Sequence, residues 1–370
     1  MEVLGTASPA RRRASASRWL AQLVLAAATL GILLVVSNGF TAVADVIAPL
    51  TGHLMGLGLA ASLAVLFPRR RLRLLTAGVA LTIGLHGWLG LARCCHAPPP
   101  AAQSGPVQAG PTKAAAHTPA YGLTVLALNT WHAHGDVPRL ERYLATTPAD
   151  VVVLSQLGPD KRPLLRRLEA AYPFQVDCAE RTCSLALLSR LPFEGAGVGR
   201  IASDQPTFVW ARLGGSLTIV GTHLDRPSRD PWLHERQVAA LAQFVRRIDS
   251  PLVLAGDLNT SPWSNAFRKL RVETGLSPAA TFVPSWPAWP LALPQVALDH
   301  IFVSPDFEVA AAGTGPAVGS DHLPVWAQLR RRPAGLNPRR SRLAAARAHL
   351  GGELFADLGG EQAGARDLRR

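Results

Sequence analysis

Three long apolar runs dominate the N-terminal quarter of the chain. They extend from Trp19 to Val36, from Val46 to Phe67 and from Leu74 to Ala92. Each has about 18–22 residues, which is enough for a helix to cross a hydrocarbon core of about 30 Å. The pattern predicts a three-helix transmembrane anchor at residues 19–93, after a basic N-terminal segment at residues 1–18.

Arginines are distributed unevenly around these runs. Four arginines precede the first run and four separate the second run from the third, whereas residues 37–45 contain none. Because arginine and lysine are enriched in cytoplasmic loops, this distribution indicates a cytoplasmic N-terminus. We therefore expect a multi-pass protein of the cell membrane whose C-terminal domain is extracytoplasmic.

A different pattern begins after the third run. Residues 94–120 are rich in alanine and proline without apolar periodicity, which is typical of a linker. From residue 121 to residue 329, strand-like apolar runs alternate with helical patterns, and some runs form hairpin-like pairs. This mixture favours an α/β domain with mixed sheets. Residues 330–370 are basic, which favours a disordered tail over an amphipathic helix around Leu343 to Leu358.

The expected strands and helices alternate along the domain. The helical patterns cover Asp136–Leu144, Arg162–Tyr172 and Pro231–Ile248. The runs expected to form strands are Leu123–Leu128, Val151–Leu154, Leu185–Leu188, Thr207–Leu213, Leu217–Gly221, Leu252–Ala255, His300–Val303, Phe307–Ala311 and Val325–Leu329.

The net charge of +13 is no evidence for a nucleic-acid substrate. Eight arginines flank the apolar runs, and the tail has ten arginines against four acidic residues. These two groups account for the net charge, so the domain itself is close to neutral. The charge therefore says more about anionic lipid near both ends of the chain than about the substrate.

Cys178 and Cys183 lie close together within the domain. In an oxidising compartment this pair could close a small loop as a disulfide. A metal site is less well supported, because no second cysteine pair or cysteine–histidine cluster accompanies them.

Polar side chains recur at the ends of the expected strands. Asp257 and Asn259, for example, follow the run that ends at Ala255. Loops at the ends of rigid elements commonly position reactive groups, so this repeated pattern indicates an active site. The polar residues at these strand ends are Asn129, Gln156, His223, Asp257, Asn259, Asp299, Asp321 and His322.

Five motifs in this region resemble those of the endonuclease/exonuclease/phosphatase superfamily. They are Leu128-Asn-Thr, Thr222-His223, Gly256-Asp-Leu-Asn259, Leu298-Asp-His-Ile-Phe-Val-Ser304 and Gly319-Ser-Asp-His322. The resemblance covers roughly residues 121–329, and the three preceding spans are similar to those of the membrane-anchored bacterial branch. It implies a four-layer sandwich, in which two mixed β-sheets pack face to face and are flanked by helices. It also implies hydrolysis of a phosphoester by water with a divalent metal, Mg²⁺ or Mn²⁺.

The resemblance further implies roles for individual residues. Residues matching Asp257 and Asn259 orient the attacking water and bind the phosphate. The residue matching His322 binds a phosphate oxygen or transfers a proton, and the carboxylate matching Asp299 fixes the tautomer of that imidazole. His223 would donate to the non-bridging oxygens.

The metal site implied by the resemblance consists of Asn129, Gln156 and Asp321. Gln156 departs from the family pattern, in which a metal-binding glutamate follows the second strand. An amide oxygen can coordinate a hard cation, but magnesium is usually held by one or two carboxylates.

Two interpretations therefore remain open. The first is a metal-dependent phosphodiesterase, nuclease or phosphatase, whose substrate is a nucleic acid, a lipid head group or a small molecule. The second is a catalytically weakened relative that binds a phosphorylated ligand or partner. The amide at Gln156 motivates the second interpretation.

Overall fold

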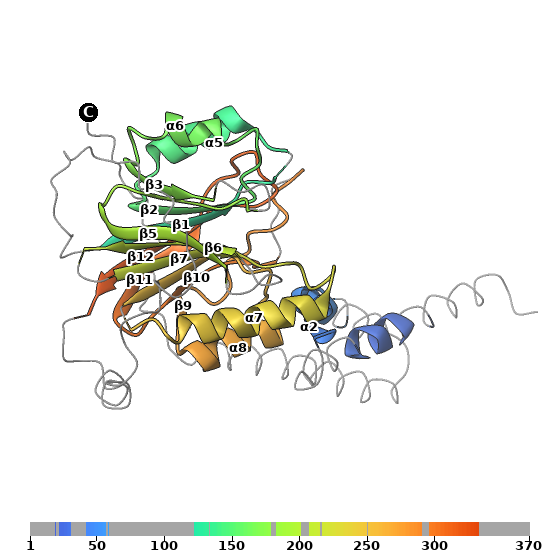
Figure 1. Ribbon diagram of the computed structural model, residues 1–370. Coiled ribbons are helices and arrows are strands. Elements are labelled where there is room, and N and C mark those ends of the chain that lie inside the picture. The colour runs from blue at the N-terminus through green and yellow to red at the C-terminus, as the bar shows by residue number, and fades with distance from the viewer. Residues whose placement is uncertain are drawn as a thin grey trace, which may run out of the picture. The chain divides into compact units, whose positions relative to one another are not determined.

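The computed structural model describes residues 19, 22–30, 42–56, 58, 122–132, 134–178, 183–200, 207–214, 217–249, 251–290 and 296–332 (Figure 1). These residues belong to two units. The first unit holds the described residues up to 58 together with residues 262–265, and the second unit holds the remainder.

The first unit contains the short helix α2 (Ala44–Ile47) and the 3-10 helix η1 (Ala48–Leu50). In the part of the chain that the structure describes, no helix is both long enough and apolar enough to cross a membrane. The first two expected spans fall only partly on described residues. The expected span at 74–92, the linker at 94–120 and the tail beyond residue 332 lie outside the described residues.

The second unit is built on two mixed sheets of six strands each. The first sheet has the strand order β11-β12-β1-β2-β4-β3. Its strands are β1 (Leu123–Asn129), β2 (Val151–Ser155), β3 (Phe174–Asp177), β4 (Ala186–Ser189), β11 (Phe307–Thr314) and β12 (Val325–Arg331). β1 and β2 are parallel, and the other pairs of described strands in this sheet are antiparallel. The helix α5 (Val137–Thr146) connects β1 to β2, and α6 (Pro163–Arg167) follows β2.

The second sheet has the strand order β5-β6-β7-β8-β10-β9. Its strands are β5 (Phe193–Arg200), β6 (Thr207–Leu213), β7 (Leu217–His223), β8 (Leu252–Asp257), β9 (Ser277–Pro278) and β10 (Asp299–Val303). The parallel strands β7 and β8 are connected by α7 (Pro231–Val245), and α8 (Asn265–Thr274) follows β8. Asp230 caps α7 by accepting hydrogen bonds from two backbone N–H groups of its first turn.

Apolar side chains form three layers between the sheets and helices. Along β1, Val125 and Ala127 join the cluster between the two sheets, whereas Leu126 and Leu128 join the cluster between the first sheet and α5 and α6. A third cluster packs the second sheet against α7 and α8. Figure 1 shows the two pairs of helices on the outer faces of the two sheets. The expected four-layer sandwich of two mixed sheets flanked by helices is therefore confirmed.

Some elements differ from those that the apolar pattern predicts. The pattern does not predict β3, β5, β9 or α8, and it extends α6 to residue 172, although residues 168–171 form hydrogen-bonded turns. β5 is hidden by its glycines, which are normally depleted in strands. An added Cβ at Gly199 would lie 2.3 Å from the ring of Phe208, and one at Gly197 would lie 3.1 Å from the ring of Trp210. Rings from β6 thus occupy the space that side chains of β5 would need.

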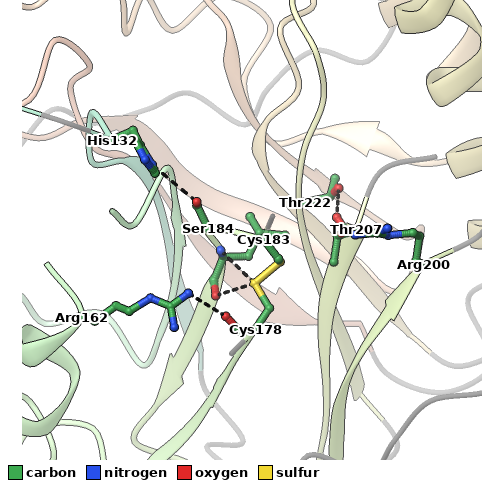
Figure 2. The surroundings of a disulfide bond; sticks show 9 residues. His132, Arg162, Cys178, Cys183, Ser184, Arg200, Thr207 and Thr222 are labelled. Carbon is green, nitrogen blue, oxygen red and sulfur yellow. Dashed lines mark hydrogen bonds between the residues drawn. A yellow bond between two sulfur atoms is a disulfide. The ribbon is translucent and has the colours of Figure 1, made fainter. Parts of the chain in front are cut away.

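Cys178 and Cys183 form a disulfide bond (Figure 2). Both cysteines are buried, and they lie between β3 and β4. Nη2 of Arg162 donates a hydrogen bond of 3.2 Å to the carbonyl oxygen of Cys178. The predicted pairing is therefore present, and it closes the connection of a two-stranded hairpin.

Replacement of both cysteines by serine should lower the free energy of unfolding by about 2 kcal/mol, because the cross-link reduces the entropy of the unfolded chain. Urea unfolding followed by circular dichroism measures the difference between the wild type and the double variant. Reduction with dithiothreitol should shift the wild type to the midpoint of the variant and leave the variant unchanged. Equal midpoints for the oxidised wild type and the variant would contradict this prediction.

Candidate active site

The residues predicted to form a site lie at one end of the strands in each sheet. Asn129 and Gln156 are at the ends of the parallel strands β1 and β2. His223 and Asp257 pair with each other at the ends of the parallel strands β7 and β8. Asp299 begins β10, opposite Asp257 in antiparallel register. Strand register alone therefore gathers these side chains in two groups, one in each sheet.

Asp257 joins the two groups. Its Oδ2 accepts a hydrogen bond of 2.8 Å from Nδ2 of Asn129, which belongs to the other sheet. Its Oδ1 accepts a hydrogen bond of 3.0 Å from the backbone N–H of Asn259. The preceding Gly256 has a φ of 141°, and an added Cβ would lie 2.0 Å from the carbonyl oxygen of Thr222. Only glycine fits immediately before this carboxylate.

His223 and Asn259 extend the site on one side of Asp257. Nε2 of His223 lies 3.5 Å from Oδ2 of Asp257 and 3.4 Å from Nδ2 of Asn259. The amide of Asn259 also donates a hydrogen bond of 2.9 Å to the carbonyl oxygen of Leu224. The side chain of His223 is 28% exposed, whereas Asn259 is buried. Of these two residues, His223 is therefore the one that solvent reaches.

His322 and Asp299 form a buried pair on the other side. Nδ1 of His322 lies 2.6 Å from Oδ2 of Asp299, and Oγ of Ser285 donates to the same oxygen at 2.6 Å. The carboxylate can only accept, so the imidazole carries a proton on Nδ1. Oγ of Ser320 accepts a hydrogen bond from the backbone N–H of His322 and donates one to the carbonyl oxygen of Asn129. These contacts attach the His322 segment to the end of β1.

Opposing effects set the charges of these groups. Burial on its own lowers the pKa of His322, but the charge and hydrogen bond of Asp299 outweigh it and raise the pKa to about 9. Burial on its own raises the pKa of Asp299, but His322 and Ser285 reverse this effect and hold the pKa below its usual value. Burial and the charge of Asp299 raise the pKa of Asp257 against the opposing effects of His322 and His223. At neutral pH, His322 is therefore cationic and Asp299 is ionised.

Two of the three predicted metal ligands have amide oxygens, and each of these oxygens accepts a hydrogen bond. Oδ1 of Asn129 accepts one of 3.0 Å from the backbone N–H of Trp131. Oε1 of Gln156 accepts one of 3.2 Å from the backbone N–H of His132. A carbonyl-type oxygen has a second lone pair, so these bonds orient the two oxygens without excluding a cation.

Buried carboxylates provide the main evidence for a cation site. Oδ1 of Asp321 and Oδ1 of Asp299 are buried and have no hydrogen-bond partner among the described residues. Atoms of Asp257, Asp299 and His322 all lie within 4.8 Å of one another, although the protonated ring of His322 is not itself available as a ligand. Buried charge without a partner is costly, and carboxylate oxygens are the ligands that hard divalent cations prefer. The residues present therefore fit a divalent cation.

Three residues at the site have left-handed backbone conformations. The φ angles are 62° at Trp131, 54° at Gln156 and 47° at Asn259, and no other described non-glycine residue has a positive φ. Each such conformation costs about 1–3 kcal/mol, so it persists only where the surrounding structure holds it. Strain of this kind clusters at functional sites, which supports the assignment of this region as the active site.

Two buried histidines that the sequence analysis does not single out also support the site. Nε2 of His234 donates to the carbonyl oxygen of Leu258 at 3.2 Å, and Nε2 of His300 donates to that of Thr260 at 2.7 Å. Burial lowers the pKa of both rings, against the opposing effect of these hydrogen bonds. Two neutral rings thus hold the backbone on either side of Asn259. No sequence signal distinguishes them from ordinary core histidines.

The loop of residues 283–290 borders the site and is attached to it at two points. Ser285 bonds to the carboxylate of Asp299, and the backbone N–H of Ala288 donates to the carbonyl oxygen of Asp321 at 2.6 Å. Trp289, in the same loop, is 60% exposed, and its ring centroid lies 5.6 Å from that of Trp131. One exposed aromatic ring, that of Trp289, therefore lies next to the residues of the site.

Residues 126–322, more than half of the 370-residue chain, match the Endonuclease/Exonuclease/phosphatase family. The chain belongs to this family, whose members are hydrolases that act on phosphoesters. No curated protein matches the chain.

Several solved structures are similar to the chain at low sequence identity. An endonuclease/exonuclease/phosphatase of Beutenbergia cavernae is 22% identical with a TM-score of 0.48, and the match covers 59% of this chain and 73% of that chain. A mannosyl-6-phosphatase of Bacteroides thetaiotaomicron is 16% identical with a TM-score of 0.46, over 56% of this chain and 99% of that chain. A sphingomyelinase C of Streptomyces griseocarneus is 20% identical with a TM-score of 0.42, over 57% of this chain and 99% of that chain.

The ion pair of His322 predicts a pH dependence of stability. The pKa of His322 is about 9 in the folded protein and 6.5 for the free side chain, so the pair stabilises the fold fully below pH 6.5 and is lost as the pH rises through 9. The stability difference between the wild type and His322→Gln should therefore shrink over this interval by on the order of 3 kcal/mol. Urea unfolding in EDTA at several pH values measures it. A difference that does not change with pH would contradict the assignment of charge.

Proposed function

We propose that the domain is a phosphoesterase that hydrolyses a phosphodiester or phosphomonoester by attack of water on phosphorus, with the help of a divalent cation. The observation that carries the proposal is the meeting of Asp257 with the His322–Asp299 pair within 4.8 Å. A carboxylate of raised pKa beside a cationic imidazole provides a proton acceptor and a positive charge in one buried place. Water attack on an anionic phosphorus centre needs both.

Each group has a proposed role in the reaction. Asp257 orients the water and accepts its proton, because a raised pKa makes a carboxylate a better base near neutral pH. His322, cationic and with Nε2 turned away from Asp299, stabilises the phosphoryl or leaving oxygen. Asp299 maintains the charge and orientation of that ring. Asn259 and His223 donate hydrogen bonds to the phosphoryl oxygens.

The divalent cation, Mg²⁺ or Mn²⁺, would be held by Asn129, Gln156 and Asp321. When bound, it would withdraw charge from the phosphoryl oxygens. The buried oxygen of Asp321 supports this assignment, because nothing else in the described part of the chain satisfies it. Asn129 also donates to Asp257, so one side chain links the proposed cation site to the proposed base.

Hydrolysis by the purified full-length chain tests the proposal. Bis(p-nitrophenyl) phosphate and p-nitrophenyl phosphate, assayed with Mg²⁺, with Mn²⁺ and with EDTA, distinguish diesterase, monoesterase and inactive protein. Asp257→Ala and His322→Ala should each lower kcat at least about a hundredfold, because each removes a proton acceptor or a charge that acts in the transition state.

Glu141→Ala is the matched control for these variants. It removes a carboxylate of the same domain that pairs with Arg167 at the surface, with 2.8 Å between Oε2 and Nε. Its activity should equal that of the wild type. Absence of turnover of both esters at every cation concentration would reject the enzyme and favour the alternative below.

The alternative function is binding of a phosphorylated ligand without efficient turnover. It is motivated by Gln156, whose side chain has no charge, because magnesium is usually held by one or two carboxylates. Gln156→Glu discriminates between the two functions, because a carboxylate here should strengthen cation binding. A large gain in Mn²⁺ affinity by calorimetry, together with a large gain in turnover, would favour the weakened relative; unchanged affinity and turnover would favour a competent native site.

We also propose that the domain is anchored in the cell membrane and faces the extracytoplasmic side. The three apolar runs and the arginines around them support this topology, and the disulfide suits an oxidising compartment. The full-length chain should stay in the membrane fraction after an alkaline carbonate wash. Protease added to intact spheroplasts should then degrade the domain. Recovery in the soluble fraction, or protection until the membrane is lysed, would overturn this topology.

A further inference from the structure

Lys161 is a buried lysine whose ammonium group lies next to the turn that contacts two proposed metal ligands, Asn129 and Gln156. Its side chain is 1% exposed. Nζ donates to the carbonyl oxygens of Trp131 and His132, both at 2.9 Å, and to the carboxylate of Asp160 at 3.2 Å. An ammonium group has three donors, and these contacts use all of them. Burial of a charged group is costly in free energy, so the position of this ammonium group indicates a specific structural role.

The two carbonyl groups belong to the residues whose N–H groups reach the site. The N–H of Trp131 bonds to Oδ1 of Asn129, and the N–H of His132 bonds to Oε1 of Gln156. Lys161 therefore binds the carbonyl groups of a turn whose N–H groups orient two of the proposed metal ligands. Asn129 in turn donates from Nδ2 to Oδ2 of Asp257. An unbroken path of hydrogen bonds runs from the ammonium to the proposed base.

The turn has two unfavourable features that the ammonium group offsets. Trp131 has a left-handed φ of 62°, which is unfavourable for a bulky residue. The carbonyl oxygens of Trp131 and His132 are both directed at one point, where their partial charges would repel each other without a cation between them. The ammonium group of Lys161 attracts both oxygens and so outweighs their mutual repulsion.

The segment that follows the disulfide also contacts this turn, at His132 (Figure 2). Oγ of Ser184, the residue after Cys183, lies 3.5 Å from Nδ1 of His132. The carbonyl oxygen of Ser184 accepts a hydrogen bond of 2.9 Å from the N–H of Leu157, the residue after Gln156. Trp131 is therefore held by Lys161, and His132 is held by both Lys161 and Ser184. Lys161 provides the buried, charged contact of the turn.

We propose that Lys161 is a positioning residue of the active site, which fixes Asn129 and Gln156 through the turn of Trp131 and His132 and fixes Asp257 through Asn129. The part of this inference that concerns catalysis rests on the proposed function. The part that concerns the turn does not, because it follows from hydrogen bonds that are independent of any substrate or cation.

Lys161→Met in the full-length chain tests both parts. The amides of Trp131 and His132 should exchange hydrogen at least about tenfold faster, because the variant removes their support by a charged hydrogen-bond donor. With bis(p-nitrophenyl) phosphate, kcat should fall at least about tenfold while KM changes less than about twofold, as expected when orienting contacts are lost.

Tyr172→Phe is the matched control. It removes another buried side-chain hydrogen bond from the same layer, in which Oη of Tyr172 donates to the carbonyl oxygen of Leu144 at 3.1 Å. It should lower the unfolding midpoint without changing exchange at Trp131 and His132 or the value of kcat. If Lys161→Met fails to fold, Lys161→Gln, which keeps two N–H donors but no charge, is measured in its place and should show the same changes to a smaller degree.

Unchanged exchange at Trp131 and His132 in the lysine variants would overturn the inference. Faster exchange with unchanged kcat would overturn the catalytic part and leave Lys161 a structural residue. If the wild type itself hydrolyses neither ester, the proposed function fails, and the exchange measurement alone decides the role of Lys161 in the turn.

Discussion

The hydrogen bond between Asn129 and Asp257 is the contact on which the site depends. Each sheet gathers its own polar side chains by strand register, and this bond joins the two groups directly, beside the indirect link from Asn129 through Ser320 and His322 to Asp299. Its length is set by how closely the sheets pack. At Gly221, in β7, an added Cβ would lie 2.7 Å from Cγ1 of Val153 in the other sheet, so the sheets are in close contact behind the site. Packing in the core between the sheets therefore controls the geometry of the polar groups at its edge.

The layers of the fold follow from the sequence because they depend on local alternation. In β1, successive residues such as Val125 and Leu126 enter different apolar clusters, and this period of two is visible without any knowledge of the partners. β5 is not visible in this way, since its glycines acquire a strand-like environment only from the rings of Phe208 and Trp210. The pattern therefore misses β5, whose packing surface is provided by the rings of a neighbouring strand.

Some residues of the candidate site are predictable from the sequence and others are not. Asn129 and Asp257 are 128 residues apart, yet both are predictable because each lies within a recognisable motif at a strand end. The sequence does not predict the roles of His234, His300 and Lys161. Their partners are backbone carbonyl groups of distant loops, and such a partner leaves no signal in the residue types. The geometry brings six of the predicted side chains together, while the catalytic and metal-binding roles stay predictions; these six are Asn129, His223, Asp257, Asn259, Asp299 and His322.

Charged groups and left-handed backbone conformations occur together at the candidate site. His322 is a cationic group that interacts with three carboxylates, those of Asp257, Asp299 and Asp321, and its raised pKa depends most on Asp299. Burial of Asp257 beside Asp299 opposes folding in the absence of a ligand, and the His322–Asp299 pair and the surrounding hydrogen bonds offset that cost. The charged groups that prepare the site to bind an anionic ligand and its cation therefore lower the stability of the empty protein.

The loop of residues 283–290 has a consequence for how new activities can arise in this scaffold. Ser285 is bonded to Asp299 and the backbone at Ala288 is bonded to Asp321, whereas Trp289 is 60% exposed. Transplanting the whole loop from a relative would disturb the reactive groups along with the surface. Directed evolution of substrate preference is better confined to single exposed positions such as Trp289, with the two attachment points retained.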